Sequence, residues 1–521
     1  MMSSNRKLPI GIQDFEKLRT GNNIYVDKTA YIYKLLQSDA PYFLGRPRRF
    51  GKSLFLSTLN AYFLGKKELF EGLAIAELER EWVEYPVLHI DMNKSVYKNI
   101  QTFENSLGVI LGEYETEWGV ENTLEEASQR LGQLITQAYK KTGRKAVVLI
   151  DEYDKPLVNT MDDIKLHEEI RNILKSFYGI LKSADTHLRF VFLTGVTKFS
   201  KVSVFSDLNQ LQDISMDNRF SGICGISETE LTGNFQPEIT ALAEKQELTY
   251  NETLAELKKQ YDGYHFSKVS EDIYNPFSLL NTFAKLDFGD YWFETGTPTF
   301  LIRMLRDIDF NVRSLENDVQ MPSDLITDYQ AGDENPVPIL YQSGYLTIKR
   351  YDREFNEYTL GFPNEEVKYG FIRRLIPAYM PGREMSNDFS ISHFIRDLRA
   401  CNVDGFMTRL RAFFDGIPSE LNNKEEKHYQ TVFYLLFKLM GQFIQTEVSS
   451  AIGRADAVVV AGDTIFIFEF KLNGKETAEN ALKQIDERKY AAQYAVSNKK
   501  IVKVGADFDV ENRTLNRWVQ G

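Results

Sequence analysis

Two groups of residues in this chain have side chains and spacing suited to chemistry at phosphate groups. The first group begins with "GRPRRFGKS" at residues 45–53, which ends in Gly51, Lys52 and Ser53. In the usual phosphate-binding loop this lysine contacts the β- and γ-phosphates, and the hydroxyl that follows it binds Mg²⁺. The usual loop also has a glycine at the place that Arg46 occupies here. The tripeptide alone therefore does not identify a nucleotide site.

A pair of acids supplies the other half of such a site. Residues 145–156, "KAVVLIDEYDKP", predict a buried strand that ends at Asp151 and Glu152. Ligands bind at this edge of open parallel sheets, so we expect Asp151 to hold Mg²⁺ and Glu152 to deprotonate an attacking water. Thr194 and Thr197 follow the next predicted strand, "LRFVFLTGV", and either contact the γ-phosphate or cap their own turn.

The second group lies near the C-terminus, in "GRADAVVVAGDTIFIFEFK" at residues 453–471. Two apolar stretches flank the turn "AGDT", which predicts a hairpin. Asp456 and Glu469 are equally far from the centre of that turn, so the two carboxylates are expected to lie opposite each other. Because side chains alternate along a strand, Lys471 is expected on the same face as Glu469.

This second group suits metal-dependent hydrolysis of phosphodiester bonds. Asp456 and Glu469 offer the oxygen ligands that hard cations prefer, and a bound cation lowers the pKa of a water molecule. Lys471 would orient that water or stabilise the developing negative charge. Glu426, at the start of the preceding predicted helix, would add a ligand. Gln484, from the following helix, would position the water.

The elements expected around these residues form two α/β parts with a helical region between them. Apolar strands that alternate with helices predict a parallel sheet, covered on both faces, over residues 1–225. Residues 226–415 have mostly helical patterns, with a linker-like stretch at 316–338 and two strands within 337–364 that resemble a wing. Residues 416–521 predict the order αβββαβ followed by a terminal helix.

Composition narrows the function classes. The 521 residues carry a net charge of −12, so a uniformly basic surface for nucleic acid is excluded and any such surface must be a local patch. Two cysteines, Cys224 and Cys401, do not suggest a disulfide framework and indicate a reducing compartment. No apolar run approaches a membrane span and no signal segment opens the sequence, so we expect a cytoplasmic protein that does not contact a membrane.

Four stretches in combination resemble the AAA-ATPase-like proteins of gut and anaerobic bacteria: "RPRRFGKSLFLSTL", "VLIDEYDKPL", "TGVTKFSKVSVFSDLNQLQDIS" and "YDGYHF…YNPFSLLN". The resemblance covers about residues 9–281. In that family the loop reads Arg-Pro-Arg-Arg-Phe-Gly-Lys-Ser/Thr, so Arg46 is the family's own variant. The resemblance implies a P-loop fold. We expect this fold to bind ATP and to hydrolyse it, with the lead-in at residues 23–36 on the adenine side. The expected nucleotide-binding residues are Arg49, Gly51, Lys52, Ser53, Leu54, Asp151 and Thr194, with Arg46 and Arg48 adding positive charge near the phosphates.

Residues 425–506 resemble the PD-(D/E)xK nuclease superfamily, in the form of the domain found joined to the AAA-ATPase-like family. "GRAD" stands where the superfamily's name has a proline. The resemblance implies a restriction-endonuclease-like fold that uses Mg²⁺ or Mn²⁺ on DNA or RNA. Its site residues would be Asp456, Glu469 and Lys471, joined by Glu426 and Gln484.

Two functions fit these residues. The first is an ATP-regulated nuclease, in which a helical middle region senses the nucleotide. The second is a nucleotide-dependent switch or scaffold whose nuclease-like domain binds a partner without cutting, which accommodates the acidic charge of the chain. A homo-oligomer or a regulatory protein partner is compatible with both functions.

Overall fold

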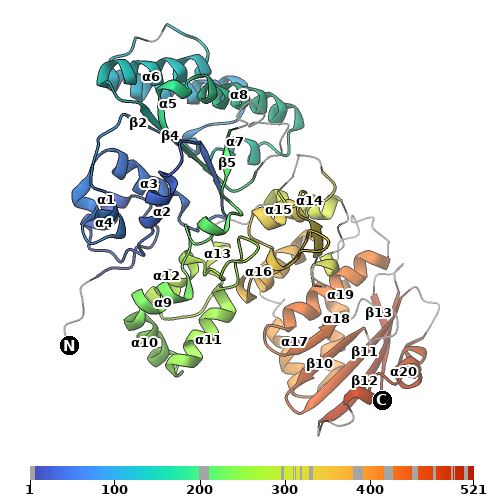
Figure 1. Cartoon of the computed structure of the whole chain (residues 1–521). Coiled ribbons are helices and arrows are strands. Elements are labelled where there is room, and N and C mark those ends of the chain that lie inside the picture. The colour runs from blue at the N-terminus through green and yellow to red at the C-terminus, as the bar shows by residue number, and fades with distance from the viewer. Residues whose placement is uncertain are drawn as a thin grey trace. The chain divides into compact units, whose positions relative to one another are not determined.

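The computed structural model shows a chain that divides into two compact units (Figure 1). The first unit comprises Met1–Gly296 and Asp318–Glu366, and the second comprises Thr297–Asn317 and Val367–Gly521. The predicted division into three domains, at residues 1–225, 226–415 and 416–521, stays a prediction. The structure describes residues 6–121, 123–198, 210–294, 299–308, 310, 312–316, 319–327, 333–379, 391–415, 426–448, 456–472, 477–494, 497, 499–509 and 514–521.

A five-stranded parallel sheet forms the centre of the first unit (Figure 1). The strand order is β2-β3-β4-β1-β5, so β4 lies between β1 and β3. The strands are nearly continuous apolar runs because helices cover both faces of a parallel sheet, and every residue of β3 is buried. The predicted α/β class is confirmed. The strands are β1 (Tyr42–Gly45), β2 (Val87–Asp91), β3 (Ala146–Asp151), β4 (Leu188–Gly195) and β5 (Gln212–Asp213).

Helices cover this sheet, with α5, α6 and α8 together on one side and α1, α3 and α4 on the other (Figure 1). Helix α6 begins after Glu126, whose backbone is extended, and it ends at Gly143, whose φ of 69° is left-handed. The helices are α1 (Phe15–Thr20), α2 (Ala30–Leu35), α3 (Lys52–Phe63), α4 (Ala74–Leu78), α5 (Ile100–Trp118), α6 (Ala127–Thr142), α7 (Lys155–Val158) and α8 (Ile164–Ser183).

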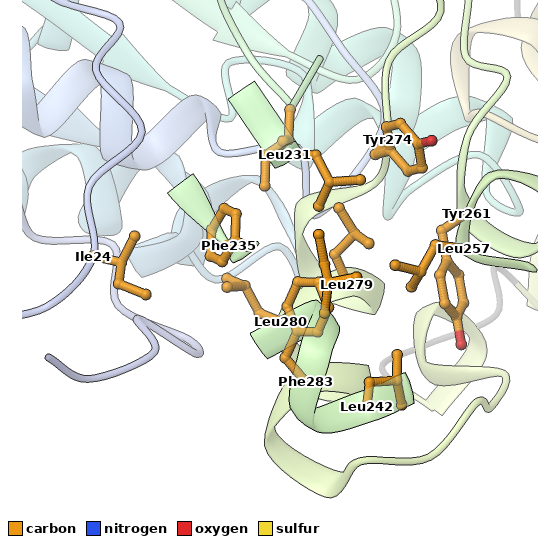
Figure 2. Close-up of a cluster of buried hydrophobic side chains, with 12 residues drawn as sticks. Ile24, Leu231, Phe235, Leu242, Leu257, Tyr261, Tyr274, Leu279, Leu280 and Phe283 are labelled. Atoms are coloured by element: carbon orange, nitrogen blue, oxygen red, sulfur yellow. The ribbon is translucent and has the colours of Figure 1, made fainter. Parts of the chain in front are cut away.

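A helical region follows in the same unit, as the sequence predicts. Capping boxes begin α9 at Ser227 and α11 at Thr249. The apolar faces of these helices form one buried cluster, which Ile24 of the N-terminal segment joins (Figure 2). The N-terminal segment is therefore part of the helical core. The helices are α9 (Glu228–Asn234), α10 (Gln236–Lys245), α11 (Tyr250–Tyr261), α12 (Pro276–Lys285) and α13 (Tyr291–Glu294).

A small antiparallel sheet of order β6-β8-β7 completes the first unit. Its strands β7 (Thr347–Asp352) and β8 (Glu357–Gly361) confirm the predicted wing, and α15 (Val337–Gln342) precedes them. The linker predicted over residues 316–338 contains a strand, β6 (Val319–Pro322), which pairs with β8. This strand escaped prediction because its hydrogen-bond partner lies far along the chain.

The second unit is built on a mixed sheet of order β13-β12-β11-β10-β9. The order α19-β9-β10-β11-α20-β12 confirms the predicted αβββαβ. The predicted terminal helix is wrong, because β13 pairs with the edge of β12 instead. The elements are α14 (Thr299–Asp307), α16 (Glu365–Tyr379), α17 (Ile391–Arg399), α18 (Val403–Asp415), α19 (Glu426–Met440), β9 (Gln445–Val448), β10 (Ala457–Ala461), β11 (Thr464–Leu472), α20 (Ala478–Glu487), β12 (Lys500–Asp509) and β13 (Thr514–Gln520). Helix α16 begins in the first unit, at Glu365 and Glu366.

Two predictions about the whole chain can be compared with the structure. In the parts of the chain that the structure describes, no helix is long and apolar enough to span a membrane. Cys224 and Cys401 are both free thiols, the first buried and the second exposed.

Candidate functional site

The phosphate loop joins the carboxyl end of β1 to the first turn of α3. Gly51 precedes α3 with a φ of 95°, a left-handed conformation that glycine adopts without strain. Among the described residues no side chain caps this turn. The N–H groups of the first turn and the positive end of the helix dipole therefore face the loop, as in an anion site.

Lys52 begins α3, and its side chain lies inside the loop. The residue is only 4% exposed, and its Nζ donates hydrogen bonds to the carbonyl oxygens of Arg46 (3.0 Å) and Pro47 (3.1 Å). These bonds hold the ammonium group against the backbone that would surround a phosphate. Ser53, half-buried, follows in the same helical turn.

The Arg46 side chain is buried within the protein, although its charge suggests a place beside the phosphates. Its side chain is 1% exposed, and its guanidinium group donates to the carbonyl oxygens of Ser215 (2.6 Å) and Phe220 (3.1 Å). The guanidinium carbon lies 4.2 Å from the ring centre of Phe266, and burial lowers the pKa of Arg46. The expectation that Arg46 adds charge beside the phosphates is therefore wrong, because this arginine ties the loop to the segments that pack against it.

Two residues at the predicted nucleotide site have strained backbones. Arg49 has a φ of 69° and Glu152 a φ of 51°, values that side chains other than glycine rarely adopt. Each such residue costs about 1–3 kcal/mol, and such strain gathers at functional sites. The exposed Arg49 side chain lies 4.9 Å from the ring centre of Phe277 in α12. Its assignment to the phosphates stays a prediction.

The acids at the end of β3 lie at the same sheet edge as the phosphate loop. Leu44 of β1 pairs with Thr194 of β4, and β4 pairs in turn with β3. Since neighbouring strands are about 4.8 Å apart, the ends of β1 and β3 are about 10 Å apart. Asp151, 5% exposed, accepts a hydrogen bond of 2.6 Å from Thr194 Oγ1. Thr194 therefore orients the carboxylate that is predicted to hold Mg²⁺.

Asp154 is a further acid at this edge that the sequence reasoning missed. Its carboxylate is 1% exposed and accepts hydrogen bonds from the backbone N–H groups of Val196 (3.0 Å) and Thr197 (2.6 Å). Burial, followed by the charge of Glu152, raises the pKa of Asp154 to about 6. Asp154 therefore fixes the turn after β4 and is a positioning residue. Its place two residues after Glu152 was the only signal in the sequence.

An apolar cavity of about 90 Å³ lies beside Gly51. It lies between the N-terminal segment, the first turn of α3 and the helical cluster of Figure 2, where Ile24, Phe235 and Leu280 are labelled. Leu54, a predicted nucleotide-binding residue, lines this cavity. Ile24–Val26 also line it, and they belong to the N-terminal segment that is expected on the adenine side. A planar apolar group bound here would lie next to the phosphate loop.

A buried carboxyl group lies behind the phosphate loop. Trp292 Nε1 donates to the carbonyl oxygen of Arg48 (3.3 Å), and the backbone N–H of Trp292 donates to Glu366 Oε1 (2.8 Å). Glu366 is 1% exposed and also accepts hydrogen bonds from Ser278 Oγ at 3.0 and 2.8 Å. Burial raises the pKa of Glu366 to about 8. This group anchors the first turn of α16 to α12 and α13.

The second unit holds the other candidate site, on the β10–β11 hairpin. Val460 pairs with Ile465 and Val458 with Ile467, so continuing the register puts Asp456 opposite Glu469. Asp456 Oδ2 accepts a hydrogen bond of 2.8 Å from the N–H of Phe470. The ring of Phe470 packs on Phe433 of α19, on the opposite face of the strand. The structure therefore brings the two predicted carboxylates together.

Gln484 of α20 links two of these side chains. Its Nε2 donates to Glu469 Oε1, and its Oε1 accepts from Lys471 Nζ. Helix α20 connects the parallel strands β11 and β12, which puts it over the face that carries Glu469 and Lys471. Four of the five predicted residues of this site thus converge, while their catalytic roles stay predictions. The side chain of the fifth, Glu426 at the start of α19, lies outside the described residues.

The Glu469 carboxylate is poorly compensated by the protein. It is 4% exposed, and its Oε2 has no hydrogen-bond partner among the described residues. Burial, and then the charge of Asp456, raise the pKa of Glu469 to about 8. A buried oxygen without a partner beside a second carboxylate is the environment that a divalent cation would stabilise, so these residues fit a metal ion. They form a pair, since no cluster of three or more His, Cys, Asp or Glu suited to a metal occurs within the described part of the chain.

Comparison with known proteins agrees with this division into two sites. Residues 9–205 match the family described as "Predicted AAA-ATPase", and residues 424–518 match the "PD-(D/E)XK nuclease superfamily". An Azotobacter chroococcum mcd 1 protein, described as "Uncharacterized protein in vnfD 5'region", is 38% identical over 526 residues. That alignment covers 99% of this chain and 99% of the other protein.

Solved structures were also matched, among them one from an archaeal protein. The Aeropyrum pernix ORC2 protein, in ADPNP-ADP complexes, is 12% identical, with coverage of 72% of this chain and 97% of that one. The TM-score is 0.20, which is too low to support an argument about fold or function.

Proposed function

Because this chain belongs to the family of the Azotobacter chroococcum protein and joins an AAA-ATPase-like domain to a PD-(D/E)XK nuclease-superfamily domain, we propose that it is an ATP-regulated, metal-dependent nuclease. In this proposal the first unit binds and hydrolyses ATP, and the second hydrolyses phosphodiester bonds in DNA or RNA. The observation that carries the proposal is Glu469 Oε2, which is buried, lacks a hydrogen-bond partner among the described residues and lies beside the Asp456 carboxylate.

In the first unit the proposal assigns the phosphates of ATP to the first turn of α3. Lys52 would exchange its bonds to the loop carbonyls for the β- and γ-phosphates, and Ser53 and Asp151 would hold Mg²⁺. Glu152 would take the proton of the attacking water. The apolar cavity beside Gly51 supports this assignment, because the adenine ring is planar and largely apolar on its faces.

In the second unit the proposal assigns the metal ion to Asp456 and Glu469, with Mg²⁺ or Mn²⁺ as the cation. When bound, the ion would supply an activated water and offset negative charge on the phosphate. Lys471 would stabilise the charge that develops on the phosphate oxygens. Gln484 would hold Glu469 and Lys471 in register, since it bonds to both. We place this activity in the cytoplasm, where ATP is available and both cysteines remain thiols.

A cleavage assay tests the nuclease directly. Purified full-length protein is incubated with labelled single- and double-stranded DNA and RNA, with Mg²⁺ or Mn²⁺ and with or without ATP. We expect metal-dependent cleavage that ATP changes and that Lys471→Ala abolishes. Lys483→Ala is the matched control, because this neighbouring lysine on α20 is 72% exposed. If wild-type protein leaves every substrate intact under all conditions, the nuclease proposal is wrong.

The second candidate function is a nucleotide-dependent switch whose nuclease-like domain binds without cutting. The net charge of −12 favours it, since an acidic protein associates poorly with nucleic acid in general. Both functions require ATP binding, which Lys52→Ala should abolish while the exposed Lys67→Ala leaves it intact. Unchanged ATP affinity in Lys52→Ala would contradict the nucleotide site in both functions.

A further inference from the structure

A cavity of about 580 Å³ lies in the second unit, outside the residues that the proposed chemistry uses. Its walls come from α16, from the turn between α19 and β9, and from η6 (Ala492–Tyr494). Val458, Val460 and Ile465 of the β10–β11 hairpin also line it. A single phosphate ion would leave most of this volume empty, whereas a nucleotide or a short strand fits the range of ligand pockets.

The cavity has the chemistry of a site for nucleic acid. Lys368, Lys438 and Lys499 line it together with Tyr369 and Tyr494, and none of its described lining residues is acidic. This is a local basic patch on a chain whose net charge is −12. Sites for single-stranded nucleic acid combine lysine or arginine along a groove with aromatic rings on which bases stack.

The lysines are held in place by their neighbours. Lys499 Nζ donates to the carbonyl oxygen of Gly462 in the hairpin turn (2.9 Å). Lys368 Nζ lies 5.5 Å from the ring centre of Tyr369. Three ammonium groups line one cavity, and the phosphates of a polyanion would complement their charge. We name this set of residues, Lys368, Tyr369, Lys438, Tyr494 and Lys499, the lysine cavity.

The lysine cavity and the carboxylate pair lie on the same face of one hairpin. Val460 pairs with Ile465 at the cavity, and the register continues through Val458 and Ile467 to Asp456 and Glu469. Because side chains two residues apart share a face, these three rows lie on one face, and its middle row is buried in the cluster that includes Ile485 of α20. The four steps from Ile465 to Glu469 span about 13 Å. The cavity and the metal-binding carboxylates therefore lie at opposite ends of this face, and a strand of a few nucleotides is long enough to reach from one to the other.

We propose that the lysine cavity binds the single-stranded segment of the nucleic acid that the Asp456–Glu469 site cuts. The lysines contact successive phosphates, and Tyr494, which is half-buried, stacks on a base. This inference rests on the proposed nuclease function, and it specifies where on the second unit the substrate binds. A strand held here has its neighbouring nucleotides within about 13 Å of the metal-binding carboxylates.

Binding without cleavage tests this proposal. The anisotropy of a fluorescein-labelled single strand is measured with full-length protein in EDTA, over a series of salt concentrations. Lys438→Ala/Lys499→Ala should weaken binding at least about tenfold and lower the salt slope by about 1.4, because each phosphate contact on a single strand contributes about 0.7. Lys140→Ala/Lys141→Ala removes the same charge from α6 of the first unit, where both lysines are exposed, and should bind as wild type does.

Further variants keep the test decisive if the double alanine variant folds poorly. Lys438→Arg/Lys499→Arg should retain binding, because the charge is kept. Tyr494→Ala should weaken binding at least about fivefold through lost stacking, whereas Tyr494→Phe keeps the ring and should bind as wild type does. A mononucleotide that competes as well as the strand would mean a small-molecule pocket and would overturn the proposal.

The outcomes separate this inference from the proposed function. If wild-type protein binds and cuts nucleic acid and the lysine variants bind equally well, the lysine cavity is not the strand site and the nuclease proposal stands. If wild-type protein neither binds nor cuts any strand, both proposals fail together.

Discussion

Two buried glutamates, one in each unit, both have a raised pKa and very different surroundings. The pKa of both Glu366 and Glu469 is raised to about 8, with burial as the first cause. Glu366 has both carboxyl oxygens bonded, to Ser278 and to the backbone of Trp292. In contrast, Glu469 Oε2 has no partner within the described residues, and Asp456 lies beside it.

The comparison shows that a raised pKa does not by itself identify a metal site. Burial alone raises the pKa of any carboxyl group. What distinguishes Glu469 is a buried oxygen that has no hydrogen-bond partner among the described residues, together with a second carboxylate at the same place. Glu366 is therefore a structural acid that is stable when protonated, whereas Glu469 is a carboxyl group that a cation would stabilise.

The most stringent test of this comparison is the same substitution at Glu469 and at Glu366. Glu469→Gln removes a proposed metal ligand, so cleavage should fall about a hundredfold to a thousandfold. Glu366→Gln makes the same chemical change and should leave cleavage within about twofold. Initial rates on a labelled substrate measure both. Equal losses in the two variants would mean that Glu469 acts only through stability.

In the first unit, substitution of Arg46 is expected to have the second-largest effect. Arg46→Met leaves buried carbonyl oxygens without donors, which should lower the free energy of unfolding by about 2–3 kcal/mol. Arg48→Met, in the same loop, should change it by less than about 0.5 kcal/mol. Denaturant unfolding of both variants measures the difference. If the Arg46→Met protein is as stable as wild type and binds ATP more weakly, Arg46 contacts the phosphates instead.

The pH dependence of stability distinguishes Glu366 from an ordinary carboxyl group. Its folded pKa of about 8 lies above the ordinary value of 4.5, so the folded state keeps the proton longer. Stability from this group is therefore complete below pH 4.5 and is lost as the pH rises toward 8, by up to about 1.4 kcal/mol per pH unit. The difference in unfolding free energy between wild type and Glu366→Gln should show this slope. A difference that does not change with pH would contradict the assignment.

The smallest expected effect is on the thermal stability of the metal-free protein. At about pH 9, above the pKa of about 8, Glu469→Gln removes a buried charge that has an adverse neighbour, so the melting temperature of the second unit in EDTA should rise by about 2–4 °C. Added Mn²⁺ should stabilise the wild type and not the variant. Differential scanning calorimetry measures both shifts. A lower melting temperature for Glu469→Gln in EDTA would mean that the protein already satisfies this carboxylate.

Local patterns predicted much of this structure. The strand, loop and helix around Lys52 were readable because they are consecutive in the chain, and the Asp456–Glu469 pairing followed from a hairpin whose two strands share one turn. Gln484 came from the family resemblance and from its place in the next helix. The roles of these residues remain predictions that the experiments above test.

Other features depended on contacts between distant segments. Arg46 is basic and sits in a phosphate loop, yet its direction is set by carbonyl oxygens near residue 215 and by Phe266. Strands β6 and β13 form only because β8 and β12 offer unpaired edges. In the sequence Asp154 has the pattern of a turn residue. Its role follows only from the backbone N–H groups after β4, which donate hydrogen bonds to it. None of these partners is visible in a local pattern.

The central claim is that Glu469 and Asp456 bind a divalent cation. Titrating Mn²⁺ into the protein without ATP, with free Mn²⁺ measured by electron paramagnetic resonance, tests it most directly. We predict that wild type and Glu366→Gln bind Mn²⁺ alike, and that Glu469→Gln binds it at least about tenfold more weakly. Equal Mn²⁺ affinity in wild type and Glu469→Gln, or no binding by wild type, would contradict the claim.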